Sequence, residues 1–349
     1  MKKFIRFTVF ILIASTIFLS LNNLLTRKTL YGWWNMTTKT NGFFNSERDT
    51  YDVIFTGSSH AYCSFNPLVI GEETGLSSYT LATQKQPLWA TYYYIKEAVE
   101  RQKPKLIVLD VFAFSLLDEY QDDGTNYTFT DDFPFGENKL KMVAESAPPE
   151  KRFDLLVKFT KYHSRWKELE SQDFGFNRKE LFDSLYGYCM LTTAAEGLTR
   201  TDTSSATAMK SSDKNEKWLR EIIKYLQDLD IPLIIVKTPL MDTPEERGYF
   251  LRAEEIAKEY NVPFYYMNDQ FDEIGLDIET DFYDRAHLNH KGADKFSRYF
   301  AKNYLGDITP KKELPEIFYK RLNKYKDEFG GDYNPFILEP MFVKYQRSI

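Results

Sequence analysis

The sequence predicts an α/β protein whose parallel β-sheet is covered by helices on both faces. Short runs of apolar, β-branched and aromatic residues alternate along the chain with longer segments of helical periodicity. Several of the short runs, among them residues 105–111, are apolar almost throughout, which is typical of strands buried on both faces. Alternating elements of this kind build one parallel sheet between two layers of helices.

The composition excludes several classes of protein. Of the 349 residues, 43% are hydrophobic and 28% are charged, which argues against disorder and against a polytopic membrane protein. The 45 basic and 51 acidic residues give a net charge of −6, so nucleic acid is not an expected partner. The two cysteines, Cys63 and Cys189, are too few for a disulfide scaffold, and a single bridge and two free thiols both stay open.

Residues 1–28 predict a membrane anchor. Lys2, Lys3 and Arg6 precede the uncharged stretch from Phe7 to Thr26, which is long enough to cross a hydrocarbon core of about 30 Å. A cleaved signal peptide is the alternative, but the small-x-small cleavage pattern is absent after the apolar run. Positive charge before the span favours a cytoplasmic N-terminus, which leaves the rest of the chain outside the cell membrane.

The remaining elements follow in order. Residues 29–50 are polar and aromatic, and we expect them to form a stalk. Asn66 before Pro67 predicts the start of the first helix of the domain, and Gly75 predicts its end. The predicted strands cover residues 51–56, 78–82, 105–111, 232–237 and 262–266, and the predicted helices cover 66–75, 86–101, 213–229, 244–260 and 289–305.

The alternation of strands and helices is interrupted between residues 113 and 211. This stretch is acidic, aromatic and rich in Ser and Thr, with short helical segments. We interpret it as an insertion into one domain that spans residues 51–305, rather than as a second domain. Residues 306–349 form a charged C-terminal extension with one helical segment.

Two loops carry candidate catalytic residues. Gly57-Ser58-Ser59-His60 follows the first strand, and Asp284-Arg285-Ala286-His287 precedes the last helix. In parallel sheets, loops at the carboxyl ends of the strands converge, so a serine and a histidine there can meet. Asp284 can then hold the Nδ1-H of His287 and leave Nε2 facing Ser59, as in a Ser-His-Asp triad. The alternative is that Ser58 and Ser59 only tighten a turn.

The two motifs resemble the first and fifth sequence blocks of the SGNH, or GDSL-like, hydrolases. Gly57-Ser58-Ser59 corresponds to the Gly-Asp-Ser of the first block, and Asp284 with His287 corresponds to the fifth. The resemblance implies a flavodoxin-like three-layer α/β/α sandwich, an enzyme without a cofactor, and Ser59 as the nucleophile of an esterase or O-acyltransferase.

The resemblance covers residues 51–112 and 213–305. Together with the anchor, it implies a bacterial enzyme that works outside the cytoplasm on an acylated cell-envelope polysaccharide or teichoic-acid-type polymer, with a membrane-bound O-acyltransferase as a further partner. Hydrolysis and transfer of the acyl group both stay open. The alternative is a catalytically silent scaffold that binds the acylated polymer or docks on such an acyltransferase.

Two features depart from the family pattern. The second-block glycine is absent from residues 82–86, and Asp110 stands where an asparagine is expected. We therefore expect the backbone or side chains of Thr83, Gln84 and Gln86 to help the Ser59 amide to bind an oxyanion.

Two further sets of residues have more than one interpretation. Arg165 lies in a segment, residues 162–166, that is similar to one in related envelope proteins; it either recognises an anionic polymer or forms an ion pair with Glu168 or Glu170. His60 and His290, with Asp284 and His287, could suggest zinc, but their spacing matches no zinc signature and no metal is expected.

Overall fold

A single parallel sheet forms the centre of the fold. The computed structural model describes residues 1–26, 37–116, 118–121, 124–169, 171–174 and 185–329. The strands lie in the order β2-β1-β3-β4-β5, and all neighbouring pairs are parallel. They are β1 (Val53–Gly57), β2 (Ser78–Ala82), β3 (Leu106–Asp110), β4 (Leu233–Lys237) and β5 (Phe264–Tyr266). This is the strand order of flavodoxin-like sheets, and it confirms the predicted fold class.

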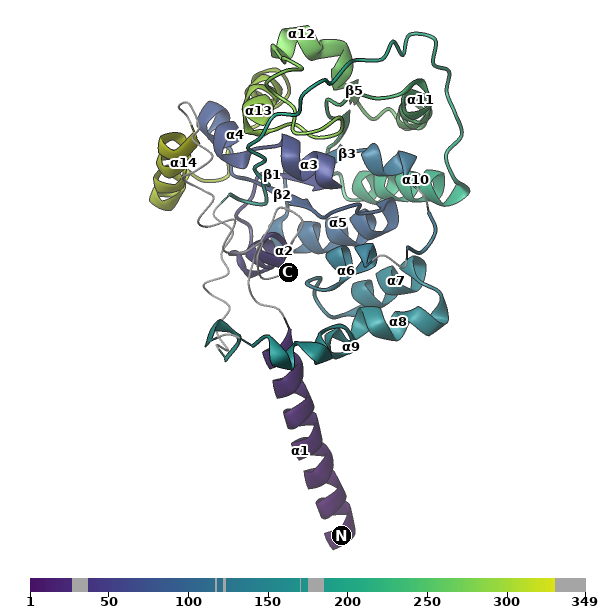
Figure 1. Cartoon of the computed structure of the whole chain (residues 1–349), viewed down its shortest axis with the longest axis vertical. Helices are drawn as coiled ribbons and strands as arrows, with labels where there is room; N and C mark the ends of the chain where they lie inside the picture. The colour runs from purple at the N-terminus through teal and green to yellow at the C-terminus, as the bar shows by residue number, and fades with distance from the viewer. Residues whose placement is uncertain (27–36, 117, 122–123, 170, 175–184, 330–349) are drawn as a thin grey trace.

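Helices cover both faces of the sheet (Figure 1). The chain moves from β1 to β2 in one direction and from β2 onward to β5 in the other, so right-handed crossovers place the connecting helices on opposite faces. Helix α4 packs against α13, and α10 packs against α5 and α11. The bounds of these helices are α4 (Pro67–Thr74), α5 (Leu88–Gln102), α10 (Asp213–Asp228), α11 (Pro244–Glu259) and α13 (His290–Tyr304).

The predicted helix signals act as capping groups. The side chain of Asn66 accepts a hydrogen bond from the Leu68 amide at 3.1 Å, Pro67 is the first helical residue, and Gly75 ends α4 at a φ of 73°. Thr243 and Glu246 form a reciprocal capping box at the start of α11. Local chemistry therefore fixes these helix ends.

The expected stalk is wrong over residues 37–50. Helix α2 (Thr37–Asn45) packs on β2, and Phe43 is fully buried against the rings of Tyr51 and Tyr79. The Tyr79 hydroxyl also donates to the carbonyl of Lys39 at 2.7 Å. These aromatic side chains cover the outer strand β2, which is why the segment belongs to the domain. The rest of the expected stalk, up to residue 36, lies outside the described residues.

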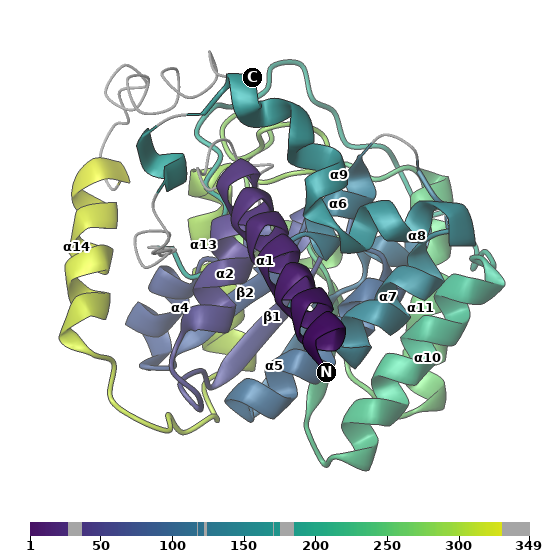
Figure 2. The same cartoon turned by 90° about the horizontal axis from the view of Figure 1, so that it is seen from below.

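Helix α1 (Lys2–Leu25) extends away from the domain (Figures 1 and 2). Within the described part of the chain it is the one helix long and apolar enough to cross a membrane. Its apolar side chains are exposed over most of its length, and Leu25 is its one buried residue. Apolar side chains that are exposed along a helix favour an apolar surrounding, as expected for a membrane anchor or a signal sequence.

The insertion consists of short helices that run from the carboxyl edge of the sheet toward α1 (Figure 1). Its helix α7 packs on α5, and the Trp89 indole donates to the Ser146 hydroxyl at 2.8 Å. The chain then returns to the sheet, where the Thr80 amide donates to the carbonyl of Tyr186 at 2.9 Å. The helical elements are η1 (Phe112–Ser115), α6 (Thr125–Thr130), α7 (Glu137–Ser146), α8 (Pro149–Leu156), α9 (Lys158–Tyr162), η2 (His163–Lys167) and η3 (Ser171–Phe174).

The described part of the C-terminal extension covers α4. Its helix α14 (Glu316–Phe329) places the buried ring of Phe318 directly over Gly71 of α4, where a side chain would collide with the ring. The Tyr325 hydroxyl donates to Asp294 of α13 at 2.8 Å. The extension therefore adds an outer layer to the α4 and α13 face of the fold.

Gly187 fixes the return of the insertion to β2, and its replacement should destabilise the fold. At Gly187, with a φ of 88°, a Cβ would collide with the backbone carbonyl of Thr80, whereas Gly197, with a φ of 71°, faces open space. We expect Gly197→Ala to cost about 1 kcal/mol of unfolding free energy and Gly187→Ala about 3 kcal/mol or more. Urea unfolding of the full chain in mild detergent, followed by circular dichroism, measures both; equal losses would contradict the predicted backbone contact.

Candidate active site

Gly57 and the short helix α3 (Ser59–Ser64) position the candidate nucleophile. Gly57 ends β1 with a φ of 144°, and a Cβ there would lie 2.8 Å from the carbonyl oxygen of Asp110 at the end of β3. Only glycine fits this close approach between the two central strands. The chain turns at Ser58 directly into α3, whose first residue is Ser59. Ser59 therefore lies at the carboxyl edge of the sheet.

The two neighbouring serines differ in their contacts. The Ser58 side chain is fully buried, and its hydroxyl makes no hydrogen bond within the described part of the chain. Ser59 is 8% exposed, and its Oγ lies 2.9 Å from Nε2 of His287. Ser59, and not Ser58, therefore has a base within hydrogen-bond reach.

The histidine and the aspartate come from one tight loop before α13. The isolated bridge between Phe282 and Leu288 closes the loop. Within it, Asp284 Oδ1 accepts the amides of Ala286 at 2.7 Å and His287 at 2.8 Å. Both carboxylate oxygens of Asp284 lie 3.0 Å from His287 Nδ1. The backbone fold of the loop thus sets the Asp284 side chain before the imidazole approaches it.

The structure joins Ser59, His287 and Asp284 in one hydrogen-bonded chain, as the spacing of the motifs predicts. Partial burial alone would raise the pKa of the Asp284 carboxyl, but the hydrogen bonds from His287 and from the two amides outweigh it and lower the pKa. Asp284 is therefore ionised at neutral pH. An ionised Asp284 selects the His287 tautomer that carries its proton on Nδ1, which leaves Nε2 free to accept the Ser59 proton.

His60 is buried next to His287. Its ring stacks on Phe112 with centroids 3.5 Å apart and lies 5.0 Å from the His287 ring. Burial, followed by the charge of Lys237, lowers the pKa of His60 well below its ordinary value, so the imidazole is neutral. The described residues contain no group of three or more side chains that could hold a metal ion.

A set of buried polar side chains, which we call the polar layer, lies next to the site at the ends of β3 and β4. Asp110 Oδ2 accepts the Thr238 amide at 3.1 Å and the Thr238 hydroxyl at 2.9 Å, while Oδ1 accepts the Phe112 amide at 3.2 Å. The fully buried Lys237 donates to the Thr238 carbonyl and lies over the rings of Phe112 and Phe250. Asp110 thus accepts hydrogen bonds and ties β3 to β4, and it does not supply the donor of the family's asparagine.

Lys237 is a residue near the site that the sequence motifs do not predict. The sequence contains a signal for this lysine, because a charged residue ends an otherwise apolar strand at the edge where the site lies. Burial lowers the pKa of Lys237 to about 8, although the nearby Asp110 acts in the opposite direction.

The loop after β2 has fewer available donors than the sequence suggested. The Thr83 hydroxyl donates to Gln86 Oε1 at 3.0 Å, and Gln86 Nε2 donates to the Thr91 hydroxyl at 2.9 Å. Gln86 is fully buried against α5, so the side chains of Thr83 and Gln86 stabilise the loop and do not serve as oxyanion donors. Gln84 is the partly exposed polar residue between them, and its carbonyl accepts the Thr128 hydroxyl of α6 at 2.9 Å.

Arg165 forms the expected ion pair, although with a different acid, and its partners lie at the end of α1 and in η3 rather than beside Ser59 and His287. One nitrogen, Nη1, donates to the carbonyl of Leu25 at the end of α1 at 2.7 Å, and Nη2 pairs with Asp173 at 2.9 Å. Asp173 therefore takes the place of the acids expected at 168 and 170, of which residue 170 lies outside the described residues. Cys63 and Cys189 are both buried and are not joined by a disulfide.

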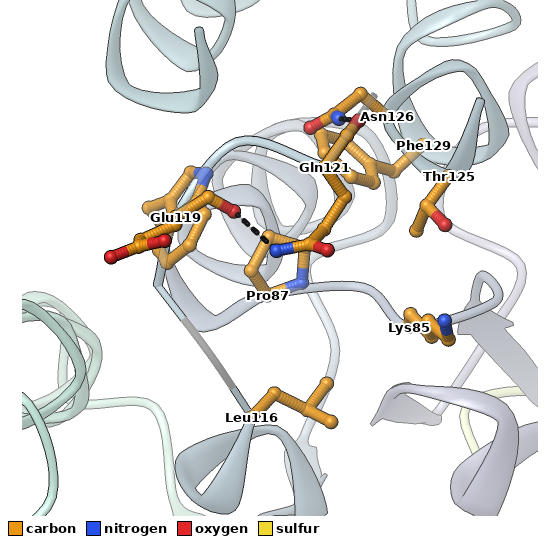
Figure 3. A pocket seen from close by; sticks show the side chains of 9 residues that line it. Lys85, Pro87, Leu116, Glu119, Gln121, Thr125, Asn126 and Phe129 are labelled. Carbon is orange, nitrogen blue, oxygen red and sulfur yellow. Dashed lines mark hydrogen bonds between the residues drawn. The ribbon is translucent and has the colours of Figure 1, made fainter. Parts of the chain in front are cut away.

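A small cavity lies beyond the loop after β2 (Figure 3). Its volume is about 130 Å³, and helix α6 of the insertion forms one of its walls. Residues Pro87, Trp89, Leu116 and Phe129 supply apolar walls, and Lys85, Glu119, Gln121, Thr125 and Asn126 supply polar ones. Because its walls follow β2 and β3, the cavity opens at the same edge of the sheet as Ser59.

Comparison with known proteins gives only distant likeness. No protein-family model and no curated protein matches the chain. A mutant of an acetyl-xylooligosaccharide esterase from Geobacillus is 14% identical, with a TM-score of 0.36 over 77% of this chain and 100% of that one. A GDSL-like lipase from Parabacteroides merdae is 11% identical, with a TM-score of 0.34 over 73% and 96%. Likeness at this level says nothing of activity, and the fold class rests on the strand order itself.

The titration of Lys237 should appear in the pH dependence of stability. Its pKa is about 8 in the folded protein and 10.5 when exposed, so between these values the unfolded chain binds more protons and stability rises with pH. Relative to Lys237→Met, the wild type should gain up to about 1.4 kcal/mol of unfolding free energy per pH unit. Urea unfolding at pH 8, 9 and 10 measures the difference, with Lys320→Met on α14 as the exposed control. A difference that is independent of pH would contradict the lowered pKa of the buried lysine.

Proposed function

We propose that this protein is a membrane-anchored, extracytoplasmic serine enzyme that cleaves or transfers an acyl ester. The observation that carries the proposal is the continuous hydrogen-bonded chain from Ser59 through His287 to Asp284. An ordinary serine hydroxyl is a weak nucleophile, and an adjacent imidazole held by a carboxylate is the arrangement that activates it.

The reaction follows from the roles of the three side chains. Ser59 Oγ attacks the acyl carbonyl while His287 Nε2 takes its proton, and the charge on the imidazole is stabilised by Asp284. The tetrahedral intermediate collapses when His287 returns the proton to the leaving alcohol, which leaves the acyl group on Ser59. Water or a second hydroxyl, deprotonated by His287, then attacks this ester, and His287 passes the proton to the departing Ser59 oxygen. Neither half of the reaction needs a cofactor.

The oxyanion requires donors near Ser59. The first amides of a helix have no carbonyl partner within the helix, so the Ser59 amide at the start of α3 is available to a developing negative charge. The second donor comes from Gln84 or from the backbone next to it, because the side chains of Thr83 and Gln86 are bonded to neighbours within and beside the loop.

The substrate we propose is an acylated polysaccharide or teichoic-acid-type polymer of a bacterial cell envelope. The anchor α1 supports this choice, since it would keep the domain at the membrane surface. If the acceptor of the acyl group is a hydroxyl of the polymer, the protein is a transferase and a membrane-bound O-acyltransferase is a suitable partner. If the acceptor is water, the protein is an esterase.

A second candidate function is a catalytically silent scaffold that binds the acylated polymer or such an acyltransferase. The observation that favours it is the position of Gln86 and Asp110, whose hydrogen bonds are made within the fold. An active site without a second oxyanion donor would lose about a hundredfold or more in rate.

Covalent labelling separates an enzyme from a silent scaffold. We expect a fluorophosphonate probe to mark the wild-type protein at Ser59, because the His287 base raises the nucleophilicity of this hydroxyl. Ser59→Ala and His287→Ala should abolish the labelling, and Ser58→Ala should retain it. Mass spectrometry of the labelled peptide locates the site. An unmarked wild type would exclude an activated serine and would leave the scaffold as the function.

Replacement of the aspartate tests the orientation of the base. Asp284→Asn removes the charge that selects the His287 tautomer, so kcat for a chromogenic acetate should fall by about 10,000-fold while KM changes little. Asp269→Asn, at an exposed position, provides the matched control. A kcat within a few-fold of the wild type would remove Asp284 from the mechanism.

A further inference from the structure

The anchor contacts a defined part of the insertion. Elements α9, η2 and η3 pack on α1, and we call their residues, 158–167 and 171–174, the collar. The rings of Phe18 in α1 and Phe159 in α9 lie 5.5 Å apart, and Arg165 donates to the carbonyl of Leu25. Figures 1 and 2 both show α9 beside the end of α1 that is nearest to the domain.

The contact between Phe18 and Phe159 sets the depth of the collar. Phe18 precedes the end of α1 at Leu25 by seven residues, which corresponds to about 10 Å along the helix axis. The uncharged part of α1, from Phe7 to Leu25, is only about 27 Å long, and a hydrocarbon core is about 30 Å thick. If α1 spans the bilayer, nearly all of this stretch is needed, and Phe18 lies within the outer leaflet. Phe159 must then lie at the same depth.

The outer surface of the collar has the side chains of a membrane interface. Trp166 and Phe174 are 64% and 61% exposed, although large aromatic rings of this kind gain from leaving water. The ammonium group of Lys167 lies 5.2 Å from the Trp166 ring centre, whereas the ammonium group of Lys161 is paired with Asp131 at 3.0 Å. Aromatic rings next to long basic side chains are typical of the level of lipid head groups, where the ring sits in the boundary and the charge reaches the phosphates.

Arg165 fastens the collar to α1. The last carbonyls of a helix have no partner within the helix, and at the membrane surface an unpaired carbonyl is costly. Arg165 donates to the Leu25 carbonyl and matches the negative end of the helix dipole, while Asp173 neutralises its charge. The arginine and its acid are both buried. This pair explains why a charged residue is buried so far from the candidate active site.

We propose that the collar is a lipid-binding element that inserts into the outer interface of the bilayer around α1. Its partner is the membrane itself, with acyl chains against Phe159, Trp166 and Phe174 and an anionic head group at Lys167. The domain is then held at a fixed height above the membrane. The inference rests on the anchor of the proposed function, and the experiment below tests the anchor and the collar separately.

Site-directed spin labelling of the full chain measures the depth of the collar. The protein is reconstituted into vesicles of phosphatidylethanolamine and phosphatidylglycerol, with the label at Trp166→Cys or Phe174→Cys, and its collisions with oxygen and with a water-soluble nickel chelate are compared. The two native cysteines are buried. Wild-type protein without an added cysteine, treated with the same spin label, controls for any reaction at them. We expect the ratio of oxygen to nickel accessibility to be about tenfold higher in the collar than at Tyr319→Cys, a 50% exposed position on α14.

A label at Phe10→Cys of α1 distinguishes the two possible failures. If Phe10 is in lipid and both collar labels are in water, the collar proposal is wrong and the anchor stands. If Phe10 is also in water, the anchor of the proposed function fails and the collar fails with it. Lipid contact at all three positions supports both.

The role of Arg165 has its own readout. Arg165→Gln should lower the oxygen preference of a label at position 166, because the collar loses its bond to α1. Hydrolysis of a soluble chromogenic acetate should stay at the wild-type rate, which shows that the domain is still folded, and Arg165→Lys should restore part of the oxygen preference. An unchanged label signal in Arg165→Gln would overturn the fastening role.

Discussion

The geometry of the candidate site depends on how α13 is fastened to α3. The Ser297 hydroxyl of α13 donates to the carbonyl of Ser64 at the end of α3 at 3.0 Å, and it accepts the Asn66 amide at the start of α4 at 2.8 Å. This fully buried hydroxyl bridges segments more than two hundred residues apart in the chain. His287 lies just before α13 and Ser59 begins α3, so one bridge holds both partners of the Ser59–His287 hydrogen bond in place.

The buried side chains of Asp110 and Lys237 influence the charge state of the groups at the site. The proposed reaction places a positive charge on His287, whose ring lies 5.0 Å from that of His60. A charged His60 would oppose this step, but burial and the positive charge of Lys237 keep it neutral. The cost of burying Lys237 is offset by Asp110 and by the two aromatic rings that face its ammonium group. The buried charge thus has an electrostatic role at the site as well as a structural cost.

The parts of the structure that local chemistry determines could be predicted from the sequence. The strand at 78–82 and the caps at Asn66 and Gly75 lie where their residues predict, because apolar runs and capping groups act within a few positions. The contact between Ser59 and His287 could be predicted from the sequence, because the loops that follow parallel strands meet at one carboxyl edge of the sheet. The choice of Asp173 as the partner of Arg165 could not be predicted, because it depends on the hydrogen bond between Arg165 and the Leu25 carbonyl at the end of α1.

The two remaining errors arose where side chains bond to one another across the fold. Gln86 has the chemistry of an oxyanion donor, and only the position of the Thr91 hydroxyl on α5 shows that its amide group is turned away. The residues of α2 look like a polar stalk, but Phe43 packs against the rings of Tyr51 and Tyr79 beside the edge strand β2. In both cases the deciding partner lies on another element, so periodicity and composition carry no signal for it.

The insertion contacts both the anchor and the short helix that begins with the candidate nucleophile. It leaves the sheet after β3, meets α1 at the collar, and returns to α3, where the Cys189 amide donates to the Tyr62 carbonyl at 2.7 Å. A chain held at three points cannot let the domain turn freely on the residues that follow α1. If the collar lies in the membrane interface, the depth of α1 therefore also sets the height of Ser59 above the bilayer. An enzyme that takes an acyl group from a membrane partner needs such a fixed distance, whereas an enzyme that acts on a soluble ester does not.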